Sequence, residues 1–274
     1  MTRARVLLAA SAALMTGLLT ALVSTAAADA APGPTDYVAL GDSYSSGTGT
    51  GDYQPDSGDC RRSDSAYPSL WANSHAVGSF SFTACNGATT QDVRNDQLGP
   101  LSDRTGLVTV SAGGNDAGFS RILRSCVFPA SDADCDAAVD TGISYVNNTL
   151  PGNLDRLYQD IKAKAPKASI VVVGYPRLFE RDVCPFSFSL HKRDSLNHAA
   201  DELDRVVAAR ARAAGSTFAD PRPAFTGHGI CGQDPWINQL NPADPVESYH
   251  PTVDGHARGY LPTVNKATGN LLTR

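Results

Sequence analysis

Residues 169–174, Ser-Ile-Val-Val-Val-Gly, form an uninterrupted β-branched run that limits the possible folds more than any other stretch. A short apolar run without polar alternation is typical of a strand covered on both faces, as in a parallel sheet. Four shorter runs have the same character, at residues 37–40, 80–84, 107–111 and 217–220. Helical patterns separate the five runs, and right-handed βαβ crossovers accommodate such an alternation. The sequence therefore predicts an α/β fold with three layers, α/β/α, around a five-stranded parallel sheet.

The helical patterns between the runs have recognisable ends. Pro68 lies near the start of the first pattern, a position where proline is well tolerated, and Pro151 interrupts the second. We expect helices at residues 65–75, 137–163 and 190–214, with a break near Pro151. A last helical pattern begins near Asp254.

The first thirty residues are typical of an export signal. Arg3 and Arg5 precede an apolar run at residues 6–23, and the small residues Ala28 and Ala30 offer a cleavage site. A membrane-spanning anchor is the alternative, but hydroxyl residues interrupt the run and an alanine-rich stretch follows it. We therefore predict a secretory signal peptide at residues 1–30 and a single domain at residues 31–274, secreted to the extracellular space.

The charge and composition of the chain exclude several partners. The formal net charge is −5 at pH 7, which gives no attraction to nucleic acid or to an anionic membrane surface. No later segment reaches the roughly 18 apolar residues that a membrane span requires, so we expect no stable membrane anchor. We expect a monomer that meets its substrate in solution or at a lipid–water interface.

Six cysteines lie after the predicted signal peptide, and an even number in an exported chain suggests three disulfides. Six cysteines allow 15 pairings, of which the pairing of sequence neighbours is the most economical. No Cys-x-x-Cys occurs, and His228 near Cys231 has no second pair, so a zinc site is disfavoured. The pairs favoured by sequence neighbourhood are Cys60–Cys85, Cys126–Cys135 and Cys184–Cys231.

Small polar residues follow the first three strand patterns. Ser43 comes after the first, Gly87 after the second and Asn115 after the third. The carboxyl ends of parallel strands meet at one edge of the sheet, and ligands bind at that edge in open α/β sheets. These residue types serve acyl transfer, in which a hydroxyl attacks and hydrogen-bond donors hold the oxyanion that develops.

A base must take the proton of the nucleophile, and six histidines are candidates. His250 and His256 lie in a late segment that can fold back over the strand edge after the last strand. Pro251 disfavours a helical conformation at His250, which favours a projecting loop residue. His256 falls in a helical pattern, where a structural role is expected.

Four blocks of residues now stand in order: Gly41-Asp42-Ser43, Gly87, Gly113-x-Asn115-Asp116 and His250-Pro251. They resemble the sequence blocks of the SGNH, or GDSL, hydrolases, and are most similar to the secreted bacterial lipase and phospholipase A1 branch. The resemblance implies a flavodoxin-like SGNH hydrolase fold, Ser43 as nucleophile and His250 as base. It also implies an oxyanion hole formed by Gly87, Asn115 and the Ser43 amide. No cofactor and no metal ion is implied.

One position departs from the family pattern, because Glu247 stands where an Asp usually precedes the base. A Glu is one methylene longer and can point elsewhere. Some members of this branch resemble a Ser-His dyad in which a main-chain carbonyl orients the histidine, and here that group is the carbonyl of Ser248. We favour the Ser248 carbonyl over the Glu247 carboxylate.

By resemblance we expect a secreted serine ester hydrolase of lipid esters, and phospholipase A1 is the first choice of activity. Triacylglycerol lipase, broad carboxylesterase and carbohydrate-ester deacetylase are alternatives, and a non-catalytic secreted binding module is the alternative of another class. Residues 127–129 and 186–188 are apolar loops that either line an acyl groove or pack in the interior. Arg61 and Arg62 offer partners for a phosphate, although solvated arginines are the commoner case.

Overall fold

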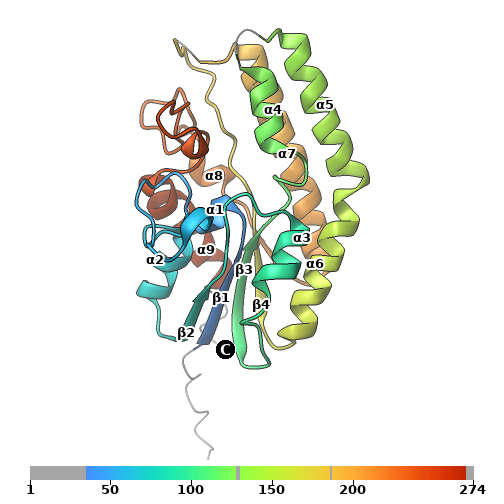
Figure 1. Cartoon of the computed structure of the whole chain (residues 1–274), viewed down its shortest axis with the longest axis vertical. Coiled ribbons are helices and arrows are strands. Elements are labelled where there is room, and N and C mark those ends of the chain that lie inside the picture. The colour runs from blue at the N-terminus through green and yellow to red at the C-terminus, as the bar shows by residue number, and fades with distance from the viewer. Residues whose placement is uncertain (1–34, 128–129, 186, 270–274) are drawn as a thin grey trace, which may run out of the picture. The chain divides into compact units, whose positions relative to one another are not determined.

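The computed structural model describes residues 35–127, 130–185 and 187–269 (Figure 1). The predicted signal peptide at residues 1–30 lies outside the described residues.

The sheet has five parallel strands in the order β2-β1-β3-β4-β5. This is the flavodoxin-like order, and the α/β prediction is confirmed. The order reverses between β1 and β3, which makes the space above their carboxyl ends the expected position of a ligand site. The strands are β1 (Thr35–Gly41), β2 (Val77–Phe82), β3 (Thr105–Ser111), β4 (Ser169–Val173) and β5 (Thr217–Ala219).

Helices cover both faces of the sheet (Figure 1). On one face α2 and α9 contact each other and the strands, and on the other face α7 packs on β4 and β5. α5 and α6 lie against α7 as a further support on that side. The α-helices are α1 (Ser43–Ser46), α2 (Tyr67–Ser74), α3 (Thr90–Asp92), α4 (Phe119–Cys126), α5 (Asp132–Asn148), α6 (Leu150–Lys164), α7 (Leu190–Ala213), α8 (Arg222–Phe225) and α9 (Leu261–Thr268).

Short 3₁₀ and π segments complete the helical structure: η1 (Gly58–Cys60), η2 (Val93–Gln97), η3 (Pro245–Glu247) and η4 (Gly255–Tyr260). The break expected near Pro151 separates α5 from α6 at Thr149. α5 begins earlier than the apolar pattern indicated, because Ser131 and Asp134 form a capping box at its start.

At the end of β1 the main chain lies so close to β3 that only glycine fits. Gly41 has a φ of +127°, and a Cβ on it would lie 2.5 Å from the main-chain oxygen of Ser111 on β3. The Gln97 side chain accepts from the Gly41 N–H at 2.7 Å and donates to its carbonyl at 2.9 Å. Asp42 then caps α1 by accepting from the Tyr44 N–H, so Ser43 begins a short helix rather than lying in an open loop.

Three disulfides join Cys60 to Cys85, Cys126 to Cys135 and Cys184 to Cys231. These are the pairs expected from sequence neighbourhood, and none of the six cysteines is free. The first bridge ties Cys60, the last residue of η1, to the segment that follows β2, and Cys60, Arg62 and Gly87 line one hollow.

We expect the Gly41→Ala variant to be destabilised by at least about 2 kcal/mol, because the added Cβ meets β3 and the backbone conformation is strained for any other residue. Urea unfolding of the variant measures the loss. Gly99→Ala is the matched control, since a Cβ there meets no atom within 4 Å. Equal stability of Gly41→Ala and the control would contradict the steric argument.

Candidate active site

The Ser43 hydroxyl and the His250 imidazole meet although 207 positions separate them in the chain. The distance from Ser43 Oγ to His250 Nε2 is 2.8 Å. Ser43 is the first residue of α1, and His250 lies on the segment between η3 and η4. Both residues are buried, with 5% and 7% of their surface exposed. This is the distance that proton transfer from a serine to a histidine requires.

The protonation of His250 follows from its two neighbours. Burial lowers the pKa of His250 to about 4, so the ring is neutral at pH 7. Its Nδ1 lies 3.0 Å from the Ser248 carbonyl, which only accepts hydrogen bonds. Nδ1 therefore carries the proton and donates it to Ser248, and Nε2 accepts the hydrogen bond from Ser43.

The Glu247 carboxylate is engaged away from His250. It accepts hydrogen bonds from Tyr53 Oη at 2.7 Å and from Asn241 Nδ2 at 3.4 Å. Of the two groups expected to orient His250, the structure places the Ser248 carbonyl against its ring and the Glu247 carboxylate against Tyr53.

The turn that carries His250 depends on an unusual backbone conformation at Tyr249, whose φ is +64°. The Tyr249 N–H donates to the Asn238 carbonyl at 2.9 Å, and its own carbonyl accepts from Tyr44 Oη at 2.7 Å. Tyr44 belongs to α1, directly after Ser43. One tyrosine therefore connects the helix that carries the serine to the turn that carries the histidine.

A buried carboxylate lies directly before Ser43. Asp42 Oδ1 accepts from Ser111 Oγ at 2.8 Å, and Asp42 Oδ2 accepts from Tyr175 Oη at 2.5 Å. Burial raises the pKa of Asp42 to about 6, and the hydrogen bonds that it accepts limit this rise. Sequence reasoning did not find Tyr175, because only the folded structure brings the loop after β4 to Asp42.

Gly87 and Asn115 lie at the same edge of the sheet as Ser43. Gly87 has a φ of +80°, and its N–H has no acceptor among the described residues. The Asn115 Nδ2 donates to the Ala88 carbonyl at 3.0 Å, which holds the amide against the turn that contains Gly87. Asn115 also lines one cavity together with Ser43. The Ser43 amide is in the first turn of α1, where N–H groups lack intrahelical acceptors.

An apolar cavity opens beside Ser43 and Asn115. Three helices supply much of its wall, with Phe119 and Ile122 from α4, Ile143 and Val146 from α5, and Leu196 and Leu203 from α7. Gly142 of α5 also lines it, and a Cβ there would lie 2.5 Å from the Ile122 side chain. The cavity therefore keeps its width because α5 has a glycine at that position.

The loops expected to form an acyl groove do not line this cavity as far as they are described. Phe128, Pro129 and Phe186 lie outside the described residues. Val127 is not among the lining residues, and Phe188 packs on Phe179 and Tyr249 instead. Much of the apolar lining comes from helix faces, whose residues also fit the pattern of an ordinary core.

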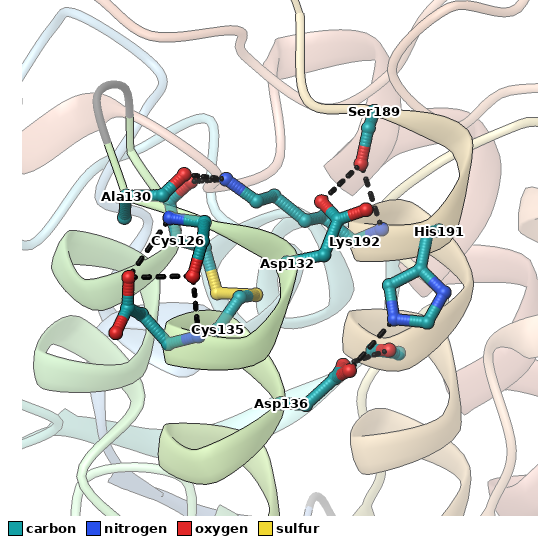
Figure 2. Close-up of a disulfide and its surroundings, with 11 residues drawn as sticks. Cys126, Ala130, Asp132, Cys135, Asp136, Ser189, His191 and Lys192 are labelled. Atoms are coloured by element: carbon teal, nitrogen blue, oxygen red, sulfur yellow. Dashed lines mark hydrogen bonds and ion pairs between the residues drawn. A yellow bond between two sulfur atoms is a disulfide. The ribbon is translucent and has the colours of Figure 1, made fainter.

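The ends of the three lining helices are tied together (Figure 2). The disulfide joins Cys126 at the end of α4 to Cys135 in the first turn of α5. The buried Lys192 of α7 donates from Nζ to the carbonyls of Cys126 at 3.0 Å and Ala130 at 2.6 Å. His191 Nε2 and Asp136 Oδ2 add a contact of 2.7 Å between α7 and α5. These contacts fix the relative position of the cavity walls.

His256 is buried away from this hydrogen-bond chain. Its Nδ1 accepts from the Tyr67 N–H at 3.3 Å, and its ring stacks on Tyr67 and Tyr260. Burial, and to a smaller extent the charge of nearby His250, lower the pKa of His256 to about 3. These contacts support the structural role that was expected for His256.

Neither a metal site nor a membrane span is found within the part of the chain that the structure describes. No group of three or more His, Cys, Asp or Glu side chains there is arranged to hold a metal ion. None of the helices in the same residues has the length and apolar character needed to cross a membrane.

Comparison with known proteins identifies close relatives. Residues 39–258 match the GDSL-like lipase/acylhydrolase family. Lipase 1 of Streptomyces coelicolor is 50% identical over 262 residues, which are 95% of each chain. The crystal structure of phospholipase A1 from Streptomyces albidoflavus superposes with a TM-score of 0.84 at 47% identity, covering 85% of this chain and 99% of that one. The structure of an extracellular lipase from Streptomyces rimosus gives a TM-score of 0.82 at 45% identity and covers 85% of this chain and all of that one.

The low pKa of His256 predicts a pH dependence of stability. The pKa of a histidine in an unfolded chain is about 6.5, so between pH 6.5 and about pH 3 the unfolded chain binds the additional proton. The contribution of the neutral His256 ring to the free energy of unfolding is therefore fully present above pH 6.5, and it decreases as the pH falls below 6.5. Between pH 6.5 and 4.5 we expect a loss of about 2 kcal/mol from this residue.

Urea unfolding of wild type and His256→Gln at both pH values checks this expectation. Gln retains an acceptor for the Tyr67 N–H and does not titrate, so the variant should lose less stability between the two pH values. A loss equal to that of wild type would contradict the assignment.

Proposed function

Because this chain belongs to the GDSL-like lipase/acylhydrolase family, we propose that it is an exported hydrolase that releases fatty acids from lipid esters, with the sn-1 ester of glycerophospholipids as its preferred substrate. The observation that carries the proposal is the 2.8 Å contact between Ser43 Oγ and His250 Nε2 beside an apolar cavity. The cavity offers an environment for an acyl chain, and the contact offers a nucleophile with its base.

In the first step, His250 Nε2 takes the proton from Ser43 Oγ as the oxygen attacks the ester carbonyl carbon. The oxyanion that forms accepts hydrogen bonds from the Gly87 N–H, the Ser43 N–H and the Asn115 side chain. The tetrahedral intermediate collapses when the carbon–oxygen bond to the alcohol breaks, and His250 gives its proton to the departing oxygen. The acyl group is then bound to Ser43.

In the second step, water gives a proton to His250 Nε2 and attacks the acyl carbon. The bond to Ser43 Oγ breaks, the proton returns to Ser43, and the free fatty acid leaves. Throughout, the Ser248 carbonyl accepts the Nδ1 hydrogen bond and keeps Nε2 directed at Ser43, which makes the pair a dyad without a carboxylate partner.

The substrate class follows from relatives and from the cavity. One relative is named phospholipase A1 and others are named lipases, which makes triacylglycerol hydrolysis the second candidate. The signal-like sequence at residues 1–30 and a relative named an extracellular lipase support export. We propose a monomer without a membrane anchor that acts at a lipid–water interface.

A fluorescent alkyl phosphonate tests the nucleophile. We expect it to label wild type but not Ser43→Ala, and we expect Ser43→Ala to lose at least about 10⁴-fold in kcat. Positional analysis of the fatty acid released from phosphatidylcholine with different sn-1 and sn-2 chains tests the substrate. A folded wild type that resists labelling would favour a non-catalytic binding module, and release from triacylglycerol alone would favour a triacylglycerol lipase.

The Glu247→Gln variant separates the dyad from a triad. Glutamine keeps an acceptor for Tyr53 Oη and removes the charge, so we expect kcat/KM to stay within about tenfold of wild type if Ser248 orients His250. Replacing the acid of a true triad lowers kcat by about 10⁴-fold. A loss of several hundredfold or more in ester hydrolysis kinetics would therefore reject the dyad.

A further inference from the structure

A second hollow lies at the turn that contains Gly87. The apolar cavity is lined by Ser43 and Asn115, whereas the second hollow is lined by Gly87 and Ala88. The Asn115 side chain donates to the Ala88 carbonyl at 3.0 Å, so the two hollows meet at this contact. A substrate whose ester lies at Ser43 therefore has an apolar space on one side and the second hollow on the other.

The second hollow is polar and carries charges of both signs. Arg62 and Asn86 contribute to its wall, and Asp92 and Asp96 also line it. Among the described residues that line the apolar cavity, Asp42 is the one Asp, Glu, Lys, Arg or His side chain. This difference gives the site a polarity that matches an amphiphile with a charged end.

Arg62 supplies the positive charge of the second hollow, and its guanidinium is available to bind a ligand. It forms no hydrogen bond or ion pair with any other side chain in the described ranges, although the residue is half-buried. The neighbouring Arg61 differs, because its Nη1 lies 2.7 Å from Asp244 Oδ2 and its guanidinium lies over the Tyr53 ring. The expectation of two solvated arginines is therefore wrong for Arg61, which has a structural partner.

The backbone of Arg62 is held by hydrogen bonds on both sides, and the segment before it is joined to the turn that contains Gly87. The Arg62 N–H donates to Ser57 Oγ at 3.1 Å, and its carbonyl accepts from the Gln54 N–H at 2.7 Å. Two positions earlier, Cys60 is bonded to Cys85, and its carbonyl accepts from the Asn86 N–H at 3.0 Å. The backbone that carries Arg62 is therefore already ordered before a ligand binds. Binding by Arg62 then loses less conformational entropy than binding by a residue on a flexible loop.

We propose that the second hollow binds the phosphodiester of a glycerophospholipid headgroup, with the Arg62 guanidinium as the phosphate ligand. This inference rests on the proposed function, since it assigns the alcohol side of the same ester. Guanidinium groups bind phosphate oxygens through two parallel hydrogen bonds, which suits a fixed arginine beside the ester. A triacylglycerol presents no anion to Arg62, so the hollow discriminates between the two candidate substrates.

The acidic residues of the hollow specify the headgroup further. Asp92 accepts from the main chain and side chain of Thr89, at 2.9 Å and 2.6 Å, and is engaged in the capping box of α3. Asp96 is exposed, and its carboxylate makes no hydrogen bond or ion pair among the described residues. A carboxylate at the rim favours a headgroup with a cation beyond the phosphate, such as phosphocholine.

The test compares two substrates with the same acyl chain: phosphatidylcholine in mixed micelles and a p-nitrophenyl ester. We expect Arg62→Gln to lower kcat/KM for phosphatidylcholine by about tenfold or more, because charge-assisted hydrogen bonds are lost. Hydrolysis of the p-nitrophenyl ester should change by less than about twofold. Arg62→Lys should restore part of the phosphatidylcholine activity, and Arg212→Gln, an exposed arginine at the end of α7 that lines neither hollow, is the matched control.

A soluble headgroup separates failure of this inference from failure of the proposed function. Glycerophosphocholine should inhibit p-nitrophenyl ester hydrolysis competitively in wild type, with an inhibition constant about tenfold higher in Arg62→Gln. If wild type does not cleave phosphatidylcholine, the proposed substrate preference is wrong, but this inhibition still supports the subsite. Absence of inhibition in wild type, or equal effects of Arg62→Gln on both substrates, overturns the inference.

The Asp96→Asn variant tests whether the Asp96 carboxylate interacts with a positive charge on the headgroup. We expect it to lower the ratio of phosphatidylcholine to phosphatidylglycerol hydrolysis by up to about fivefold, the range of an exposed charge pair. An unchanged ratio would remove Asp96 from the subsite.

Discussion

The position of Ser43, the proposed nucleophile, depends on one buried carboxylate, that of Asp42. An ionised carboxylate in a protein interior is unfavourable unless hydrogen bonds compensate its lost hydration. Here the donors come from three parts of the fold: the Tyr44 N–H of α1, the Ser111 hydroxyl at the end of β3, and the Tyr175 hydroxyl after β4. Two of these donors lie at strand ends of the sheet, Ser111 as the last residue of β3 and Tyr175 shortly after β4, so the start of α1 cannot move relative to the sheet without breaking hydrogen bonds to Asp42. Ser43, the next residue, is thereby fixed to the sheet.

The histidine side of the site is fixed by different means. His250 lies on a turn without regular structure, and Tyr249 before it has a positive φ that a non-glycine residue adopts only when its surroundings enforce it. The enforcing contacts are the Asn238 carbonyl and Tyr44 Oη. The second contact comes from the helix that Asp42 caps. The same buried network therefore sets both members of the Ser43–His250 pair, and strain in the turn is balanced by the contacts with Asn238 and with Tyr44 of α1.

The sequence predicted what depends on local pattern. The five strands, the break near Pro151 and the placement of Ser43, Gly87 and Asn115 at strand ends all follow from short apolar runs and from glycine and proline positions. Contacts between distant segments could not be read in this way. The partner of Glu247 is Tyr53, 194 positions away, and the partner of Arg61 is Asp244, 183 positions away. No periodicity encodes such pairs, because the intervening chain decides whether they meet.

The apolar cavity could not be predicted from the sequence for a related reason. Its lining residues on α4, α5 and α7 have the spacing of ordinary core positions, so their pattern cannot show whether three helices close on one another or leave space. Gly142 leaves room for Ile122, and the Cys126–Cys135 bridge with Lys192 holds the helix ends in place.

An apolar cavity of this kind determines which end of an amphiphile can enter it. A charged headgroup cannot enter the space lined by Ile143 and Leu196 without losing its hydration, whereas an acyl chain gains by leaving water there. Under the proposed function, the ester of an amphiphile is presented to Ser43 in one orientation, with the acyl carbonyl carbon toward the Ser43 hydroxyl and the alcohol toward Gly87. The boundary between an apolar and a polar space then sets the orientation, and the proposed hydrogen-bond donors at that boundary only need to recognise the oxyanion.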